Sequence, residues 1–205
     1  MTGIMSLDIE TANFSWEIGG WENKALFEPS VVATWDGDEA HIFTKEEIEV
    51  EGATVHDLHP RTLGEHIENH LQKGGRLLGH NIIQFDLPVL KDSIDCWAAG
   101  DALYKFNDQV LDTKRLVQKA SLFSSGRVAT SLDLLTKYTL SDTKSMKSVE
   151  APIAWREGKF EEVASYCLKD AKLTLDLYNF GKDNGIIKAR SLETGKIVDI
   201  EVEWG

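Results

Sequence analysis

The sequence predicts one α/β domain in which helices cover both faces of a mixed β-sheet. Three observations lead to this prediction: short apolar segments of strand length near the start, a hairpin signal between two of them, and apolar residues at helical spacing later in the chain. A chain of 205 residues can bury one sizeable core. Its 42% hydrophobic and 27% charged residues are typical of a globular chain rather than a disordered one.

The first three strands are expected to follow one another as an antiparallel meander. Residues 3–9 form a short apolar run, which fits a buried strand better than a helix. Residues 31–35 and 40–43 are mostly β-branched or aromatic, and the Asp-Gly-Asp-Glu sequence at 36–39 is a strong hairpin signal. Residues 13–28 contain aromatic side chains and glycines without a regular period, so we expect a long loop there.

A helix, a strand and a second helix are predicted next. Leu63, Ile67 and Leu71 are spaced as on one face of a helix, and the Gly-Gly pair that follows ends it. Residues 76–79 then predict a short buried strand. The apolar residues of segment 85–90 predict a helix, in which a proline is tolerated in the first turn.

The second half of the chain is predicted to be mainly helical. A strand over 110–113 precedes a helix that starts at its N-cap Ser131 and runs to residue 138, and the polar segment 141–150 is expected to be a mobile loop. The longest helix is predicted over 159–182, where apolar residues recur with a period near 3.6. Two alternating segments around a glycine turn then predict a C-terminal β-hairpin, residues 186–190 and 196–203.

The predicted order of elements is three strands, helix, strand, helix, strand and helices. This order is the layout expected of a ribonuclease H-like fold, with a mixed five-stranded sheet flanked by helices. We therefore expect residues 1–185 to form the ribonuclease H-like domain and residues 186–205 to be a β-hairpin extension of it.

The charge of the chain limits its partners. A formal net charge of −12 argues against a general polyanion binder, because phosphates are contacted by Lys and Arg. The charge is unevenly distributed, with ten acidic and two basic residues from Asp36 to His70, but seven basic and two acidic from Lys114 to Lys147. A polarised surface could offer one cationic side to nucleic acid, and the alternative is that both stretches are solvated faces.

The sequence contains no signal for a membrane or for disulfides. No apolar run approaches the roughly 18 residues of a bilayer span, and the first residues lack the features of a signal peptide, so we expect a cytoplasmic protein that does not enter a membrane. Cys96 and Cys167 are too few and too far apart for a disulfide framework. We expect both to be reduced packing residues.

Three separate stretches carry the carboxylates on which a catalytic site could be built. Asp8 and Glu10 are two residues apart on a predicted strand, so their side chains point to the same side. Asp86 lies where a strand passes into a helix, and Asp170 lies on the longest helix, one turn after Tyr166. Taken alone, the first pair fits a solvated surface pair, Asp86 fits a helix start and Asp170 fits an exposed helix charge.

Taken together, these residues predict a metal site. Oxygen ligands without Cys or His suit Mg²⁺ or Mn²⁺ rather than zinc. If the four carboxylates converge, they could hold two divalent ions, and such a pair can activate a water and stabilise the leaving oxygen in phosphodiester cleavage. Tyr166 would then lie beside the metal site, where a phenol could orient or help to deprotonate the attacking water.

The three stretches resemble the three motifs of the DEDD superfamily of 3′→5′ exonucleases, in its DEDDy branch. They are most similar to the proofreading exonuclease domains of family B DNA polymerases and their free-standing relatives. The motifs correspond to residues 8–11, 81–86 and 166–170, and the similarity runs from about residue 4 to residue 178, leaving the terminal hairpin outside it. The tyrosine four residues before Asp170 indicates the tyrosine branch.

The resemblance implies a role for each matching carboxylate. Asp8 would bridge both metals, while Glu10 and Asp170 would complete the site of the nucleophile-side metal. Asp86 would serve the leaving-group side through water, and Tyr166 would position the nucleophile.

The resemblance also implies the substrate. Asn81 and Phe85 would hold and back the terminal nucleotides, and the backbone around Thr11 would lie near the 3′ end. The expected activity is a two-metal-ion-dependent 3′→5′ exonuclease that hydrolyses phosphodiester bonds at single-stranded 3′ ends and releases nucleoside 5′-monophosphates. DNA is favoured over RNA, although motifs do not disclose contacts with the 2′-hydroxyl.

Alternatives stay open at this point. The chain could be a non-catalytic nucleic-acid-binding or adaptor module on the same fold, or a structure-specific endonuclease, and it could work with a protein partner. Phe14, Trp16 and Trp21 could stack on bases of a single strand or simply anchor their loop. His66 and His70 are spaced as two metal ligands on a helix, but no third ligand is evident, so a solvated face is expected.

Overall fold

The computed structural model describes residues 3–124, 126–142, 146 and 149–204. Residues 143–145 and 147–148 lie outside the described residues, so the predicted loop 141–150 and the basic stretch 114–147 are described only in part. Within the described chain, no helix combines the length and the apolar character needed to cross a membrane.

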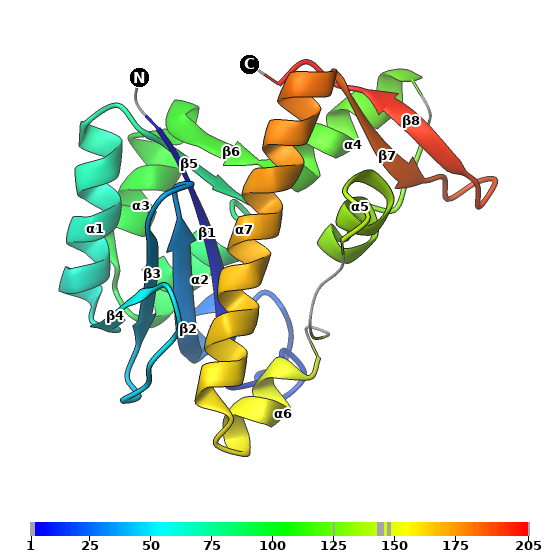
Figure 1. Cartoon of the computed structure of the whole chain (residues 1–205). Helices are drawn as coiled ribbons and strands as arrows, with labels where there is room; N and C mark the ends of the chain where they lie inside the picture. The colour runs from blue at the N-terminus through cyan, green and yellow to red at the C-terminus, as the bar shows by residue number, and fades with distance from the viewer. Residues whose placement is uncertain (1–2, 125, 143–145, 147–148, 205) are drawn as a thin grey trace.

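A six-stranded mixed sheet forms the centre of the molecule (Figure 1), which confirms the predicted mixed α/β architecture. Its order is β4-β3-β2-β1-β5-β6. As predicted, the first three strands are antiparallel neighbours, whereas β5 runs parallel to β1 and β6 parallel to β5. The bounds of the strands are β1 Ile4–Thr11, β2 Pro29–Trp35, β3 Ala40–Thr44, β4 Thr54–Asp57, β5 Arg76–Gly79 and β6 Val110–Asp112.

The predicted count of five strands is wrong, because β4 adds a sixth at the outer edge. Its four residues are Thr-Val-His-Asp, two of them exposed and two only half-buried, so they have no apolar alternation that a sequence pattern could reveal. The strand forms because the open edge of β3 offers unpaired backbone groups, and residues 54–57 pair with residues 41–44 in parallel.

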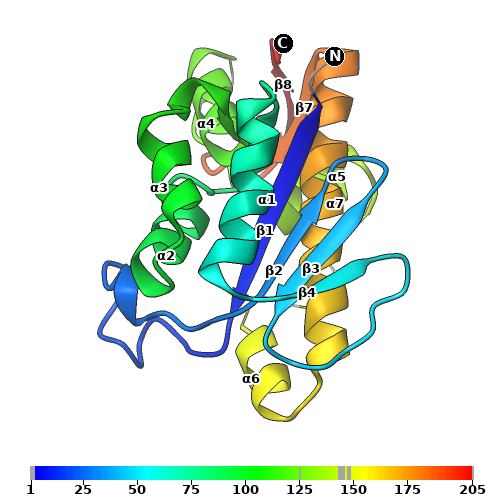
Figure 2. The same ribbon diagram turned by 90° about the vertical axis from the view of Figure 1, so that its left-hand side faces the viewer.

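Helices cover both faces of the sheet (Figures 1 and 2). The group α1–α3 lies on one face and the long helix α7 on the other. The bounds of the α-helices are α1 Pro60–Gln72, α2 Asp86–Ser93, α3 Trp97–Tyr104, α4 Thr113–Ser124, α5 Leu132–Thr139, α6 Ala151–Arg156 and α7 Phe160–Asn184, with short 3₁₀ helices at η1 Lys24–Leu26 and η2 Asn107–Gln109.

The sequence pattern missed α3, α4 and α6. Helix α4 begins at Thr113, directly after β6, so the predicted strand included the first residue of the helix. Helix α3 is short, and its buried residues are the alanines 98, 99 and 102, which give only a weak apolar signal. Ser131 does stand at the N-cap of α5, but its side chain makes no capping hydrogen bond.

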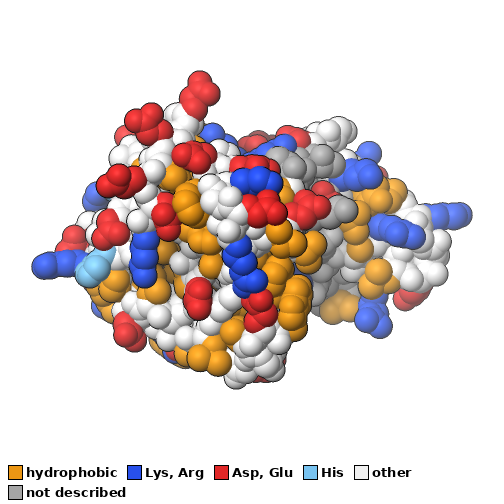
Figure 3. All heavy atoms as spheres, turned by 90° about the horizontal axis from the view of Figure 1, so that it is seen from below, with side chains coloured by type: hydrophobic (Ala, Val, Ile, Leu, Met, Phe, Trp, Pro, Cys, Tyr) orange, Lys and Arg blue, Asp and Glu red, His pale blue; other side chains and the backbone are white. Residues whose placement is uncertain are grey.

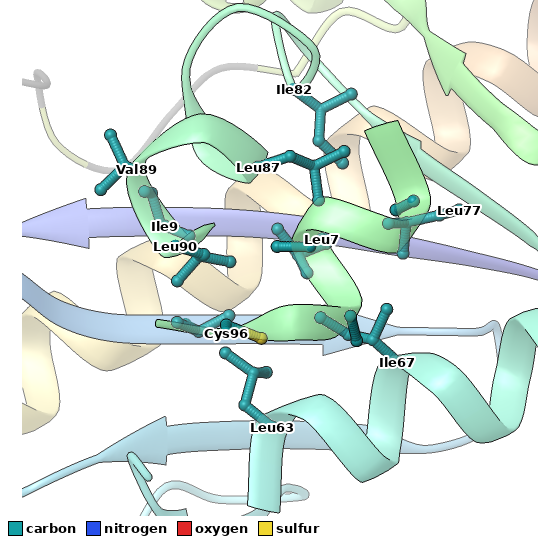
Figure 4. Packing of buried hydrophobic residues seen from close by; sticks show 14 of the residues in the cluster. Leu7, Ile9, Leu63, Ile67, Leu77, Ile82, Leu87, Val89, Leu90 and Cys96 are labelled. Carbon is teal, nitrogen blue, oxygen red and sulfur yellow. The ribbon is translucent and has the colours of Figure 1, made fainter. Parts of the chain in front are cut away.

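Successive side chains of β1 point alternately toward the main core and toward the carboxylate site. Leu7 and Ile9 point into the cluster formed with α1 and α2, where they meet Leu63, Ile67 and Leu87 (Figure 4). Since neighbouring residues on a strand point to opposite faces, Asp8 and Glu10 are directed to the side on which α7 runs.

The C-terminal hairpin is formed by β7 (Ile186–Arg190) and β8 (Ile197–Glu201), as predicted. Helix α7 ends at Asn184, and the left-handed conformation of Gly185 after it (φ 69°) turns the chain into β7. The indole of Trp204 stacks on the ring of Tyr178 from α7 with the ring centroids 5.6 Å apart. The hairpin therefore shares a buried apolar cluster with α7 rather than standing apart from it.

Candidate active site

Three of the four predicted carboxylates come together. Asp8 and Glu10 from β1 and Asp170 from α7 each offer an oxygen, and these oxygens lie within 4.8 Å of one another. Among the described residues, no other group of three Asp, Glu, His or Cys side chains is this close. Glu10 and Asp170 are buried and Asp8 is half-buried. The arrangement is therefore a compact oxygen-donor set at the junction of the sheet and α7.

The fourth carboxylate, Asp86, approaches β1 at a different point. It is the first residue of α2, and its side chain is buried. Its Oδ1 accepts a hydrogen bond from the backbone N–H of Ile9 at 3.2 Å. The pairing of β5 with β1 reaches only as far as Ser6, which leaves this part of the β1 edge open to Asp86. Asp86 is outside the group of three, but it is fixed against the strand that carries Asp8 and Glu10.

A cavity of about 940 Å³ joins these groups. Its wall is built by β1, the loop after it, the turn before α2, the starts of α4 and α5, the region of α6 and Asp170 of α7. Seven of the predicted site residues line it: Asp8, Glu10, Thr11, Asn81, Phe85, Asp86 and Asp170. Residues from all three stretches therefore line one common space.

Tyr166 is the predicted site residue that does not line this cavity. Its side chain is 1% exposed and belongs to the apolar cluster between α7 and the strands β2 and β3. The four-residue spacing brings it to the same side of α7 as Asp170, and its ring is buried there. Its role in positioning a nucleophile stays a prediction.

Cys167, predicted only as a packing residue, is also a neighbour of the site. Both cysteines are free and buried, as expected. The thiol of Cys167 also donates to Asp8, with Sγ 3.3 Å from the backbone oxygen and 3.5 Å from Oδ2. Burial, followed by the charges of Asp8, Glu10 and Asp170, raises the pKa of this thiol well above its ordinary value. The group therefore stays protonated and can orient the Asp8 carboxylate.

The turn that carries Asn81 is held from β6. Asn81 has a positive φ of 73°, a conformation that Asn adopts more readily than most residues. The buried carboxylate of Asp112 accepts hydrogen bonds from the backbone N–H groups of Asn81 (3.0 Å), Ile83 (3.3 Å) and Arg115 (3.3 Å). The Nζ of Lys114 donates to the Asn81 side-chain oxygen at 3.2 Å. Asn81 is therefore fixed at both its backbone and its side chain.

Asp112 and Lys114 were missed as parts of the site, although a signal for them exists. Strands β5 and β6 are parallel, so their carboxyl ends lie at the same edge of the sheet. Polar residues directly after such neighbouring ends tend to meet, which applies to the segments that follow Gly79 and Leu111. Both strands could be predicted from their own segments, whereas the parallel pairing that brings their ends together joins distant parts of the chain.

His66 corrects the expectation of a solvated face on α1. Its Nε2 lies 3.0 Å from Thr34 Oγ1, and its ring packs against those of His41 and Phe43. Burial, then the nearby histidines, lower the pKa of His66 from 6.5 to about 4. His70 instead contacts the backbone oxygen of Arg76 at 3.1 Å, so the two helix histidines face different partners.

Comparison with known proteins does not assign this chain to a family. No protein-family model matches the chain, and a search of curated proteins finds no significant match. The candidate site is therefore defined by its carboxylates, the cavity that they face and the hydrogen bonds that hold them.

Proposed function

We propose that this protein is a metal-dependent 3′→5′ exonuclease of the DEDDy type that acts on single-stranded ends, favours DNA over RNA and releases nucleoside 5′-monophosphates. One observation carries the proposal: Asp8 and Glu10 meet Asp170, some 160 positions away in the sequence, with carboxylate oxygens within 4.8 Å, and Asp86 faces the same cavity. Three motifs recognised separately in the sequence thus converge on one space, which chance matches would not be expected to do.

The strand order supports a ribonuclease H-like fold as part of this proposal. The strands β3, β2, β1, β5 and β6 are adjacent in that order, with the first three antiparallel and the last two parallel to β1. This is the mixed five-stranded layout expected of the fold, and β4 and the hairpin β7–β8 are additions to it.

The donor set fits divalent magnesium or manganese. Asp8, Glu10 and Asp170 provide only oxygen atoms, which hard divalent cations prefer. Three carboxylates at such close range repel one another when ionised, and a cation among them would offset that repulsion. These three residues would hold one ion, and Asp86 would serve a second. Bound ions of this kind supply an activated water and stabilise charge on the leaving oxygen.

The residues of the chain contribute to the proposed site in four ways. The thiol of Cys167 and the backbone of Ile9 hold the carboxylates of Asp8 and Asp86 in fixed orientations. Asn81, held by Lys114, offers its amide to the sugar-phosphate of the terminal nucleotide. The half-buried ring of Phe85, next to Asp86, can back a terminal base. Tyr166, buried on α7 four residues before Asp170, would orient the attacking water.

The test compares oligonucleotides labelled at either end, with Mg²⁺ or Mn²⁺ and with EDTA. We expect the 3′ label to leave first as a mononucleotide and the 5′-labelled strand to shorten progressively. Asp170→Asn should lower the rate by at least about a hundredfold. Asp176→Asn, an exposed acid on the same helix, is the matched control and should retain activity. Metal-independent cleavage, or full activity in Asp170→Asn, would refute the proposal.

The design of the Asp86 variant follows from its hydrogen bond. Asp86→Ala would leave the buried N–H of Ile9 without this acceptor and could cost about 1 to 3 kcal/mol of stability. Asp86→Asn keeps an oxygen at this position, so loss of cleavage in that variant reports on chemistry rather than on folding. Oligonucleotide binding without turnover would instead identify a non-catalytic module, and cutting of circular single strands would identify an endonuclease.

A further inference from the structure

We propose that the loop between β1 and β2, residues 13–28, is a stacking platform for the unpaired bases next to the 3′ end of a single strand. We call this segment the aromatic loop. The inference rests on the proposed exonuclease function and specifies how the same cavity holds its substrate: by ring stacking more than by charge.

The first support is the exposure of large rings at the cavity. Trp16 is 67% exposed and Trp21 60% exposed, yet both line the space that also contains the carboxylates. Figure 3 views the end of the molecule at which α6 lies in Figure 1, and hydrophobic side chains are exposed there among acidic and basic ones. Exposed apolar surface beside a cavity is typical of a binding site rather than of an inert surface.

The second support is that the loop is internally braced. The side chain of Asn13 donates to the backbone oxygen of Leu26 at 2.8 Å and accepts from the N–H of Glu28 at 3.0 Å, which ties the two ends together. Asn23 donates to the backbone oxygen of Ile18 at 2.7 Å. The exposed tryptophans are therefore presented on a compact, closed loop, which lowers the entropic cost of binding a ligand on them.

The third support is the arrangement of Phe14 and Trp16. Their rings stack with centroids 4.2 Å apart and planes 13° apart. The guanidinium of Arg156 lies 5.4 Å from the centre of the Phe14 ring and is held by a bidentate pair with Glu17, at 2.9 and 2.6 Å. Because Trp16 is so exposed, part of its ring remains available to a base.

The fourth support is continuity with the carboxylates. Trp21 packs edge-on against Phe85 with centroids 5.3 Å apart, and Phe85 also packs against Phe27 at 5.1 Å. Phe85 directly precedes Asp86. The rings thus lead from the surface to the proposed site of cleavage, which is the path that a single strand ending at the carboxylates would follow.

Charge decides between stacking and electrostatic binding. Within the described lining, Lys114 is the one Lys or Arg, against six acidic residues: Asp8, Glu10, Asp86, Asp133, Glu150 and Asp170. Two more cations lie over rings of this region, Lys24 over Phe85 at 5.1 Å and Arg156 over Phe14. Few phosphates can be neutralised by this set. Base stacking on aromatic side chains is worth about 1 to 3 kcal/mol per base. A stacking contact neutralises no phosphate, so it adds nothing to the counterion release that makes binding depend on salt.

The experiment measures binding and cleavage in Trp16→Ala, Trp21→Ala and the double variant. The matched control is Tyr104→Ala, which removes a 75% exposed ring that does not line the cavity. Binding of a labelled oligothymidine is followed by fluorescence anisotropy in Ca²⁺. Cleavage is followed on the same oligomer and on the p-nitrophenyl ester of thymidine 5′-monophosphate, which has no neighbouring base.

We expect each substitution to weaken oligomer binding about tenfold and the double variant by more, whereas binding by the Tyr104→Ala control should be nearly unchanged. Cleavage of the ester should fall less than cleavage of the oligomer, because the ester has no neighbouring base to stack on the platform. The logarithm of the wild-type association constant should fall with the logarithm of salt with a slope no steeper than about −2, as three cations allow. Equal oligomer binding in the double variant, or a steeper slope, would overturn the inference while leaving the exonuclease proposal standing. Tryptophan-dependent binding without any cleavage would support the platform and refute the exonuclease.

Discussion

The substitution Asp112→Ala tests how the turn that carries Asn81 is held. The buried Asp112 carboxylate accepts three backbone N–H bonds, from Asn81, Ile83 and Arg115. At no less than about 1 kcal/mol for each donor left without this acceptor, the free energy of unfolding falls by at least about 3 kcal/mol. For a chain of this size, each kcal/mol lowers Tm by about 2 to 4 °C, so we expect a fall of at least about 6 to 12 °C.

The assay is thermal unfolding followed by circular dichroism, together with the exonuclease rate at a temperature where the variant is folded. Asp108→Ala, an exposed acid four residues earlier, is the control and should shift Tm by less than about 1 °C. Asp112→Asn keeps acceptor oxygen but loses charge and should fall between the two. A Tm within about 2 °C of wild type in Asp112→Ala would show that the turn does not depend on this carboxylate.

Three further predictions concern parts of the molecule outside the carboxylate cluster. The pKa of His66 is lowered from 6.5 to about 4 in the folded protein, so the unfolded chain takes up a proton there at a higher pH than the folded one. The contribution of His66 to the free energy of unfolding is therefore fully present above about pH 6.5 and is lost, by at most about 3 kcal/mol, as the pH falls toward 4. Urea unfolding at pH 7 and pH 5 should therefore show a smaller pH difference in His66→Gln, and an equal difference would contradict the shift. The buried thiols of Cys96 and Cys167, both with raised pKa, should resist a thiol reagent in the native protein and react fully in urea; rapid native labelling would count against their burial. In Gly181→Ala the new Cβ would lie 2.5 Å from the Trp204 ring, so the free energy of unfolding should fall by about 1 to 3 kcal/mol. An unchanged urea midpoint would mean that the C-terminal hairpin is loosely packed against α7.

The elements that carry the carboxylates could be predicted because local patterns specify them. The two-residue spacing of Asp8 and Glu10 on a short apolar strand fixes their common direction, and β1 has that form. The apolar stripe of α7 likewise fixes the side of the helix on which Asp170 lies. Their meeting required only that α7 pack on the face of β1 opposite α1–α3, which follows from helices covering both faces.

The supporting residues are not specified by any local pattern, because their roles depend on contacts between distant segments. Asp112 reaches Asn81 only because β6 pairs with β5, and Cys167 reaches Asp8 only because α7 crosses β1 at that point. Likewise β4 has no apolar alternation of its own and forms on the free edge of β3. The burial of Tyr166 could not be predicted either. Its spacing from Asp170 predicts which side of α7 it lies on, but not how much of its ring is exposed.

The most direct test of the central claim is hydrolysis of a single-stranded oligonucleotide in ¹⁸O-labelled water with Mn²⁺. If Asp8, Glu10 and Asp170 hold the metal that activates the attacking water, the wild type should release nucleoside 5′-monophosphates that carry the heavy oxygen on the phosphate. Glu10→Gln, assayed beside it, should release almost none. Products that end in a 3′-phosphate, or equal release by Glu10→Gln, would contradict the account.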